Sequence, residues 1–171
     1  TYDGGLNLIS TTDQIKSASD LKVKHYLPKE DGSSVFNATI FSLKKDRNGN
    51  MWLGTYAGIN FVNPRGEPVN LITNSLNATA RITHNRINAI AEDPSGKLYI
   101  GTDGGGVDHF DPKSKSYEYS IFDENKGLKS NHILSLLSDH NKQIWIGTYL
   151  GGLSKYNFNT KRWKHYLQGE K

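Results

Sequence analysis

The chain has 171 residues, of which 35% are hydrophobic, and its net charge is +4. This size and composition suit one globular unit with a real core, and no apolar run approaches the length of a membrane span. The absence of cysteine excludes disulfides, thiolate catalysis and zinc–thiolate sites, and the scattered lysines and arginines argue against a nucleic-acid-binding surface.

The first residues, Thr1 to Gly5, are the tail of a phrase that recurs three times further along the chain. The full phrase is aromatic, aliphatic, glycine, threonine, two variable residues and glycine, at Trp52–Gly58, Tyr99–Gly105 and Trp145–Gly151. The threonines at 1, 55, 102 and 148 lie 54, 47 and 46 residues apart. Repeats of this length are typical of propeller blades and solenoid units. Because the chain opens inside a repeat and without methionine, we expect it to be a piece of a longer protein.

Residues 1–29 are expected to form half a blade. Leu6 to Ile9 and Val23 to Leu27 have the β-branched, aromatic and aliphatic composition of strands. The insertion between them, residues 10–21, contains the one stretch, Thr12 to Leu21, that could hold a short helical turn.

Three complete blades are expected at 36–74, 84–124 and 130–168. In each, an apolar first strand ends in an aspartate nine residues before the threonine, and a turn rich in Gly, Asn and Ser follows. The aromatic–aliphatic–glycine–threonine phrase is the second strand, in which the glycine leaves room for a neighbouring backbone. The four strands are expected at 40–43, 52–55, 59–62 and 68–72; at 87–91, 99–102, 107–110 and 117–122; and at 133–137, 145–148, 153–156 and 162–167.

The predicted fold class is therefore all-β, a partial β-propeller of about three and a half four-stranded antiparallel blades. Helical solenoids are excluded because the chain lacks amphipathic helical stretches of sufficient length. Propellers close with roughly four to eight blades. We therefore expect a fragment of a larger, seven-bladed propeller, whose remaining blades and neighbouring domains are partners of this segment.

Two features of the repeat carry a family resemblance. Asn-x-Ile leads into the first strand at Asn85–Ile87 and Asn131–Ile133, and Trp-Ile-Gly-Thr-x-x-Gly-Gly-Leu ends at Leu153. The chain departs from the pattern at Tyr99, which replaces Trp, and at Lys142, which replaces Gly. These repeats resemble the two-component regulator propeller repeats. The resemblance implies the periplasmic sensor region of a hybrid two-component histidine kinase, a homodimer that recognises a glycan-derived ligand such as an oligosaccharide and signals across the membrane. Its kinase residues would lie outside this chain.

Candidate ligand-binding residues come from the turns between second and third strands and from the connections between blades. Both groups lie on one face of a propeller, where loops on a rigid scaffold vary freely. Tyrosine offers a flat apolar face for a sugar ring and a polar tip for its hydroxyls. The candidates are Tyr2, Asp3, Tyr56, Asp103, Tyr149, Arg81, His84, Arg86 and His132, with Leu150 beside them. Arg81, His84 and Arg86 could reach an acidic sugar or a sulfate, although solvated loop charges are the simpler interpretation.

Other patterns indicate structure rather than chemistry. The glycine-rich run 101–106 joins two strands, whereas a phosphate-binding loop leads into a helix. Asp46–Asn50 and Asp123–Gly127 lack the glutamate of a calcium loop and favour hairpin turns. One position of the repeat holds Trp52, Tyr99 and Trp145, which favours packing between blades. No catalytic residue, metal site or cofactor is predicted, and neither nucleic acid nor membrane contact.

Two alternatives to the sensor remain open. A propeller enzyme, such as a lyase with a central metal or histidine, would use His109 or His132. A pure interaction scaffold would use the propeller faces for dimerisation or for docking neighbouring domains.

Overall fold

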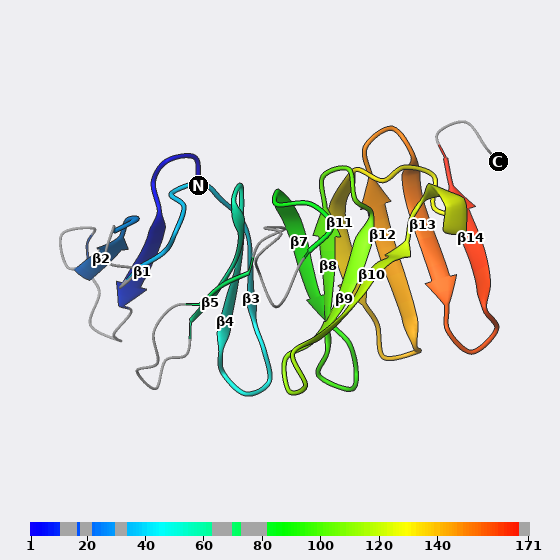
Figure 1. Cartoon of the computed structure of the whole chain (residues 1–171), viewed down its shortest axis with the longest axis horizontal. Helices are drawn as coiled ribbons and strands as arrows, with labels where there is room; N and C mark the ends of the chain where they lie inside the picture. Colours follow the sequence, from blue (N-terminus) through cyan, green and yellow to red (C-terminus); the bar gives the residue numbers. More distant parts are fainter. Residues whose placement is uncertain (11–16, 18–21, 30–33, 63–69, 73–81, 168–171) are drawn as a thin grey trace.

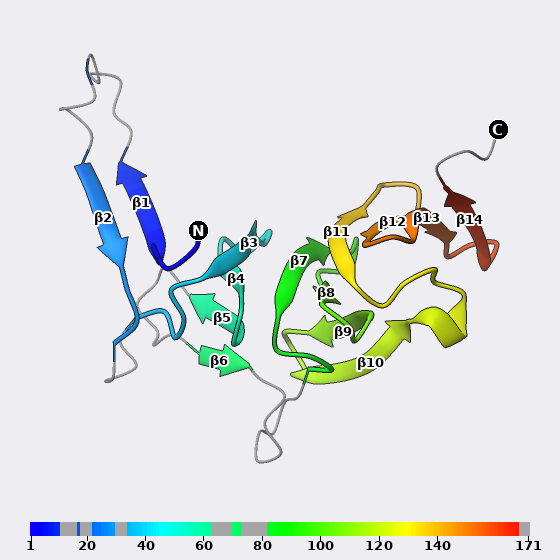
Figure 2. The same cartoon turned by 90° about the horizontal axis from the view of Figure 1, so that it is seen from above.

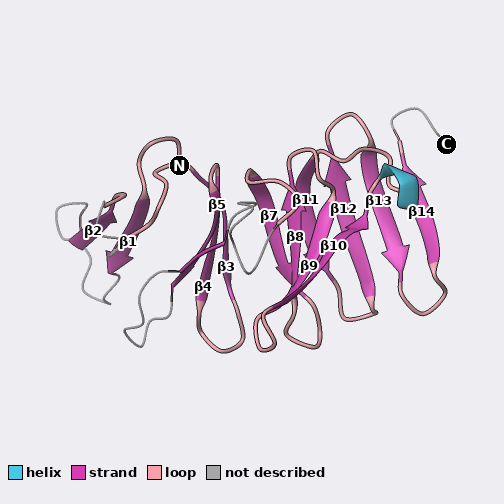
Figure 3. Cartoon of the chain, in the orientation of Figure 1, coloured by secondary structure: helices cyan, strands magenta, loops and turns pink. Residues whose placement is uncertain are grey.

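The computed structural model describes residues 1–10, 17, 22–29, 34–62, 70–72 and 82–167. Its described part consists of β-strands and one short 3-10 helix, η2 (Glu124–Lys126) (Figures 1 and 3). The strands are β1 (Leu6–Ser10), β2 (Lys22–Tyr26), β3 (Ile40–Lys45), β4 (Met51–Thr55), β5 (Gly58–Val62), β6 (Asn70–Ile72), β7 (Ile87–Glu92), β8 (Leu98–Thr102), β9 (Val107–Asp111), β10 (Ser116–Phe122), β11 (Ile133–Ser138), β12 (Gln143–Thr148), β13 (Gly152–Asn157) and β14 (Arg162–Tyr166).

The strands pair in chain order into one two-stranded and three four-stranded antiparallel sheets: β1-β2, β3-β4-β5-β6, β7-β8-β9-β10 and β11-β12-β13-β14. Seen from above, the sheets fan outward, with the first strands β3, β7 and β11 nearest a common centre (Figure 2). The all-β class and the blade architecture are therefore confirmed. The blade boundaries and the blade count of the parent protein stay predictions.

The turn between the first and second strands of each full blade is built around its aspartate. The Asp46 carboxylate accepts hydrogen bonds from the backbone N–H groups of Asn48 and Asn50, both at 2.9 Å. It also accepts one from the indole N–H of Trp52 at 3.0 Å. The backbone part of this pattern recurs at Asp93 and Asp139. The aspartate that marks each repeat therefore fixes the hairpin, because its side chain satisfies donors that the turn leaves free.

The threonine of the repeated phrase closes the turn between the second and third strands. Its hydroxyl donates to the carbonyl of a glycine at the entry of the third strand, at 2.8 Å for Thr55 and Gly58. The same bond joins Thr1 to Gly5, Thr102 to Gly106 and Thr148 to Gly152. All four glycines have positive φ, a conformation that glycine adopts without steric cost.

The glycine of the phrase sets the distance between neighbouring blades. A Cβ atom added at Gly54 would lie 2.8 Å from Cγ2 of Ile87, and one added at Gly101 would lie 2.5 Å from Cγ2 of Ile133. Both isoleucines begin the first strand of the next blade and are fully buried. The blades approach this closely because the second strand carries no side chain there. Two clusters of buried apolar side chains fill the two interfaces.

Packing between blades holds for two of the three repeated aromatics. Trp52 and Tyr99 are 3% and 5% exposed and belong to the interface clusters. Trp145 is only half-buried and stacks on Tyr166, with ring centroids 5.9 Å apart. The difference arises because the described part of the chain places no sheet beyond the one formed by β11–β14.

Two local expectations need correction or stay open. Residues 123–127 do not form a hairpin turn: they contain η2, with Asp123 as its N-cap and left-handed Gly127 as its C-cap, in the connection between two blades. The Asp123 carboxylate accepts from the Lys126 N–H at 3.0 Å, so this acidic run caps a helical turn. The expected helical turn at 12–21 lies outside the described residues, apart from Ser17.

Candidate functional site

One backbone hydrogen bond joins the two groups of loops that the candidate residues occupy. In each full blade, the residue after the repeated threonine donates its N–H to the residue before the first-strand isoleucine. The bonds are Tyr56 to Thr39 at 3.3 Å, Asp103 to Arg86 at 3.0 Å and Tyr149 to His132 at 2.9 Å. The second-to-third-strand turns and the incoming connections therefore share one edge of the sheets, which we call the rim.

Residues of these turns also contact the incoming connection of the neighbouring blade. The hydroxyl of Thr39 donates to the Asp3 carboxylate at 3.0 Å. Two repeats later, Asp103 forms an isolated antiparallel bridge with His132, and their side chains meet at 2.7 Å between Oδ1 and Nδ1. At these two interfaces a turn residue therefore contacts the residue before the isoleucine of the next blade, and we call this succession of turns and connections a row along the rim.

Part of this row encloses a hollow of about 380 Å³, the rim hollow. Tyr2 and Asp3 come from the half-blade, and Arg86 comes from the connection into β7. The remaining lining residues belong to the blade between them: Asn37, Thr39, Phe41 and Tyr56. Tyr2 and Tyr56 are 82% and 60% exposed. Three neighbouring sheets therefore contribute aromatic, amide, hydroxyl and charged side chains to one concavity.

Arg86 is held in place on both sides. Its guanidinium carbon lies 4.8 Å from the centroid of the Phe41 ring, and Nη1 lies 3.0 Å from Oδ2 of Asp103. Since Asp103 also contacts His132, the side chains of Arg86, Asp103 and His132 form a short chain of contacts along the rim. The Phe41 ring in turn meets the edge of Tyr2, with centroids 6.0 Å apart. These contacts orient the arginine and compensate its charge.

The structure separates the nine candidates into groups. Tyr2, Asp3, Tyr56 and Arg86 line the rim hollow, and Asp103 and His132 adjoin it through Arg86. Tyr149, 57% exposed, lies further along the rim, next to His132. His84 contacts its own loop: its Nδ1 accepts a hydrogen bond from the backbone N–H of Arg86 at 3.2 Å. Arg81 lies outside the described residues.

Sequence reasoning did not select Thr39 or Phe41 for the site, and it covered Asn37 only as part of the inter-blade connection 29–37. Asn37 accepts from the Thr39 N–H at 2.8 Å and so shapes the connection that enters β3. Phe41 follows the first-strand isoleucine and is the unpaired residue of a β-bulge between Ile40 and Ser42, and it lines the rim hollow. No sequence signal was available for it, because a bulge interrupts the alternation from which the face of a strand residue is inferred.

The described residues offer little for catalysis. The pair formed by Asp103 and His132 is partly exposed, and no serine or threonine hydroxyl is recorded in contact with the His132 ring. Within the described ranges, no three histidine, aspartate or glutamate side chains are grouped so as to hold a metal ion. What the arrangement offers chemically is a shallow polar and aromatic recognition surface.

Three segments of the chain, residues 34–57, 81–104 and 127–150, match the family model described as two component regulator propeller. Each covers the end of an inter-blade connection, the first strand, the aspartate turn and the second strand. The chain therefore contains three two-component regulator propeller repeats. Among the described residues, no helix has the length and hydrophobicity that a membrane span requires.

A curated relative is "Histidine kinase P4" of Formosa agariphila, 33% identical over 88 residues, which cover 52% of this chain and 6% of the kinase. A solved extracellular domain of a putative hybrid two component system from B. thetaiotaomicron superposes with a TM-score of 0.65 at 21% identity, covering 76% of this chain and 18% of that one. PorZ of Porphyromonas gingivalis, a surface component of the type-IX secretion system, superposes with a TM-score of 0.70 at 23% identity, covering 90% and 22%. These structures show the fold. The chain spans less than a quarter of each of these three proteins.

Proposed function

From three two-component regulator propeller repeats on one chain, we propose that the protein supplies part of the ligand-sensing propeller of a hybrid two-component sensor histidine kinase. The match to a histidine kinase and the fold shared with an extracellular domain of a hybrid two-component system support this assignment. The segment would lie in the periplasm, within a homodimeric parent. The phosphoryl chemistry would be carried out by other domains of that parent.

The rim hollow is the proposed ligand site, and its lining carries the proposal. Tyr2 and Tyr56 offer exposed aromatic faces, which suit the apolar faces of sugar rings. Asp3, Asn37 and Thr39 line the same hollow and can hydrogen-bond ring hydroxyls. An oligosaccharide bound there would contact three neighbouring sheets at once, so binding would restrict their relative movement and could be transmitted to the rest of the protein.

The charges at the hollow favour a neutral glycan. Arg86 is the one cationic side chain among the lining residues, and Asp103 already compensates it at 3.0 Å. Asp3 adds a negative charge to the lining. A sulfated or acidic sugar would therefore meet one neutralised cation and an uncompensated carboxylate.

Calorimetric titration of neutral oligosaccharides into the chain tests the site. We expect Tyr56→Ala to weaken binding about tenfold, a loss of about 1.4 kcal/mol. Tyr149→Ala is the matched control, because Tyr149 holds the equivalent place in its repeat and is similarly exposed. The control should change the dissociation constant less than about twofold.

Three outcomes would contradict the proposed site. Absence of binding across a broad panel, in this chain and in the complete ectodomain, would favour the interaction scaffold. Equal losses in the two variants would place the ligand elsewhere on the rim. Turnover of a bound glycan that disappears in His132→Ala would favour the enzyme.

A further inference from the structure

The edge of the sheets opposite the rim carries an excess of cations in the last two blades. The turns between first and second strands and between third and fourth strands lie at this edge, because antiparallel strands reverse direction at every turn. Figure 1 shows these turns together at the lower end of the sheets. With their flanking residues they are the segments 93–97, 111–116, 139–143 and 157–162, which contain six lysines and arginines but only three aspartates.

Five of these cations are exposed to solvent. They are Lys113, Lys115, Lys142, Lys161 and Arg162, which we call the lysine edge. None of the ion pairs found among the described residues involves any of the five. The three aspartates of the same segments each accept a hydrogen bond from a backbone N–H of their own turn. The cations of the lysine edge are therefore available to a partner outside the chain.

The backbone at this edge holds lysine where glycine would be less strained. Three of the five residues other than glycine with positive φ in the described part of the chain lie here, and all three are lysines: Lys115, Lys142 and Lys161, at 56°, 56° and 54°. The counterparts of Lys142 in the two preceding blades are Gly49 and Gly96. Glycine adopts this conformation without the steric cost that a Cβ atom brings. Because strained backbone gathers at functional positions, three strained lysines on one edge indicate a role for their charge.

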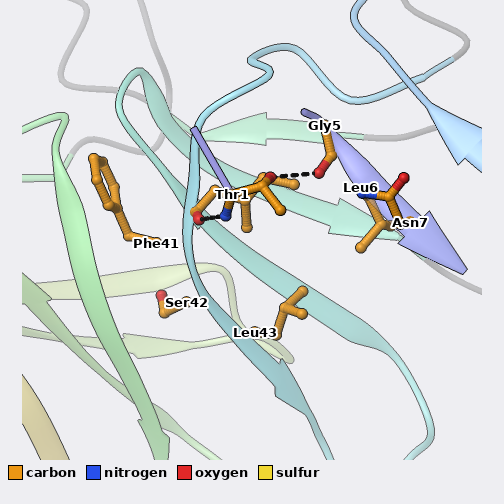
Figure 4. Close-up of a pocket in the computed structure, with 8 residues that line it drawn as sticks. Thr1, Gly5, Leu6, Asn7, Phe41, Ser42 and Leu43 are labelled. Carbon is orange, nitrogen blue, oxygen red and sulfur yellow. Dashed lines mark hydrogen bonds between the residues drawn. The ribbon is translucent and has the colours of Figure 1, made fainter. Parts of the chain in front are cut away.

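The surroundings of the lysine edge suit neither a protein partner nor a small ligand. No exposed large hydrophobic side chain of the described residues lies in the four segments, whereas protein interfaces are built around aromatic and apolar anchors and are poor in lysine. The rim hollow has no lining residue from these segments, nor has a second hollow of about 240 Å³ beside Thr1 and Leu6 (Figure 4). The cations therefore stand on turn tips, outside both hollows.

We propose that the lysine edge binds the surface of an anionic lipid bilayer. The turn tips of two neighbouring blades end at the same edge, so a flat surface can meet them together. Lysine carries a compact, hydrated charge, which anionic headgroups attract without the fixed geometry that an arginine fork requires. An extended polyanion would instead be held along a charged groove.

This contact differs from the expectation drawn from the sequence, which was that the segment makes no membrane contact. The lysines are scattered along the sequence, and those of the lysine edge belong to two different repeats. They gather because alternate turns of each four-stranded sheet reach the same edge. Further blades would pack beside the sheets, as β3–β6 packs beside β7–β10, and would leave the turn tips uncovered.

Sedimentation of the chain with lipid vesicles tests the lysine edge. We expect binding to vesicles made of phosphatidylcholine and phosphatidylglycerol in equal parts, and none to vesicles of phosphatidylcholine alone. Raising the salt concentration about tenfold should weaken the binding, because counterions screen the attraction between exposed charges.

A triple glycine variant removes the charge without straining the fold. Lys115→Gly, Lys142→Gly and Lys161→Gly together should weaken vesicle binding at least about tenfold. Since glycine suits the left-handed backbone at all three positions, the variant is expected to stay folded, which thermal unfolding checks. A triple arginine variant at the same positions keeps the charge and should bind within about twofold of the wild-type chain.

The matched control removes three cations from the opposite edge. It combines Lys29→Gln, Lys126→Gln and Lys129→Gln, whose lysines lie in the connections between blades. The control loses the same net charge as the triple glycine variant, yet its affinity for the vesicles should change less than about twofold.

Four results would overturn the lysine edge as a bilayer-binding surface. They are absence of binding to the phosphatidylglycerol vesicles, equal losses in the glycine variant and the control, loss of binding in the arginine variant, and binding of dextran sulfate without binding of vesicles. The last would assign the edge to an acidic polysaccharide. None of them bears on the sugar titration, because Tyr56 and Tyr149 lie on the rim.

Discussion

At the scale of single residues, the blade formed by β7–β10 has a different aromatic pair where the preceding blade has a tryptophan and a phenylalanine. Trp52 donates its indole N–H to Asp46 and packs on Phe61, with ring centroids 4.6 Å apart. In the next blade Tyr99 has no such N–H. His109, which holds the position of Phe61, instead places Nε2 at 3.2 Å from Asp93 and stacks on Tyr99 with centroids 4.7 Å apart. The tyrosine and the histidine therefore replace the tryptophan and the phenylalanine as a pair.

This exchange predicts strong coupling between the two positions. We expect Tyr99→Trp and His109→Phe to destabilise the chain by about 1 kcal/mol each. Tyr99→Trp brings an additional N–H donor to the Asp93 carboxylate, whereas His109→Phe removes the imidazole that this carboxylate contacts. The double variant recreates the pair of the preceding blade and should recover most of the loss. Urea unfolding of all four proteins gives the coupling energy. Additive effects would show that His109 does not replace the indole.

The turn aspartates make stability depend on acidic pH. The pKa values of Asp46, Asp93 and Asp139 all lie below the ordinary value. Burial by itself raises each pKa, but the hydrogen bonds that each carboxylate accepts outweigh it. A carboxylate with a lowered pKa in the folded chain stabilises the fold above its unfolded pKa, and this contribution is lost as pH falls through the folded pKa.

We therefore expect the free energy of unfolding to decrease as pH falls below about 4. Asp46→Asn should reduce stability at pH 7 and should also flatten this decrease, because the amide does not titrate. Urea unfolding between pH 7 and pH 3 measures both effects. Parallel curves for the wild-type chain and the variant would show that Asp46 contributes nothing to the acid dependence.

At the scale of elements, the glycine of the second strand decides whether two sheets can pack. A Cβ atom at Gly101 would meet Ile133 and Leu136 of the next blade. A Cβ atom at Gly147, its counterpart in the last blade, would meet the Ser135 side chain within its own sheet, and Oγ of that serine is the nearest atom. A serine hydroxyl can rotate away, whereas a buried strand cannot. The same residue type therefore has different importance at the two positions.

From this difference we expect Gly101→Ala to destabilise the chain by about 3 kcal/mol, since it overpacks an interface between blades. Gly147→Ala should cost about 1 kcal/mol or less, at the lower end of such overpacking effects. Thermal unfolding followed by circular dichroism ranks the two variants. Similar losses would mean that close approach within a sheet, rather than between sheets, requires the glycine.

At the scale of the whole molecule, the scaffold and the proposed ligand site use different parts of each repeat. The rim hollow opens on the edge of the sheets where turns and connections meet, whereas the buried apolar clusters fill the interfaces between blades. This separation lets one repeated strand pattern build the scaffold while its variable turn residues provide recognition.

The compensated charge of the rim predicts binding that is insensitive to salt. Because Arg86 is already paired with Asp103, a neutral oligosaccharide gains little from long-range electrostatics. We expect its dissociation constant to change less than about twofold between 50 and 500 mM salt. Calorimetry at the two ionic strengths measures this. A tenfold weakening at high salt would instead indicate an acidic ligand in contact with Arg86.

The sequence by itself was sufficient for the strands, the blade pattern and the family. These depend on local chemistry repeated in register: apolar runs that end in aspartate, a glycine that admits a neighbour, and a threonine that closes a turn. It also placed the turn residues Tyr2, Asp3 and Tyr56 on the same edge of the sheets as the connections between blades. Both the 3-10 helix at Glu124–Lys126 and the left-handed backbone of Lys142, at φ 56°, were missed. In each case residues typical of a solvated turn adopt a conformation that only their neighbours select.

Only the tertiary structure decided which rim residues meet. The positions of Tyr56 and Tyr149 are equivalent in the repeat, yet Tyr56 shares a hollow with Arg86 and Phe41 while Tyr149 does not. The reason is that a rim residue's surroundings come from the adjacent blade: Arg86 belongs to the connection that follows Tyr56, whereas the described residues place no sheet beyond the one that carries Tyr149. The residues of each repeat by themselves determine its strands, whereas a site between blades depends on how two repeats pack against each other.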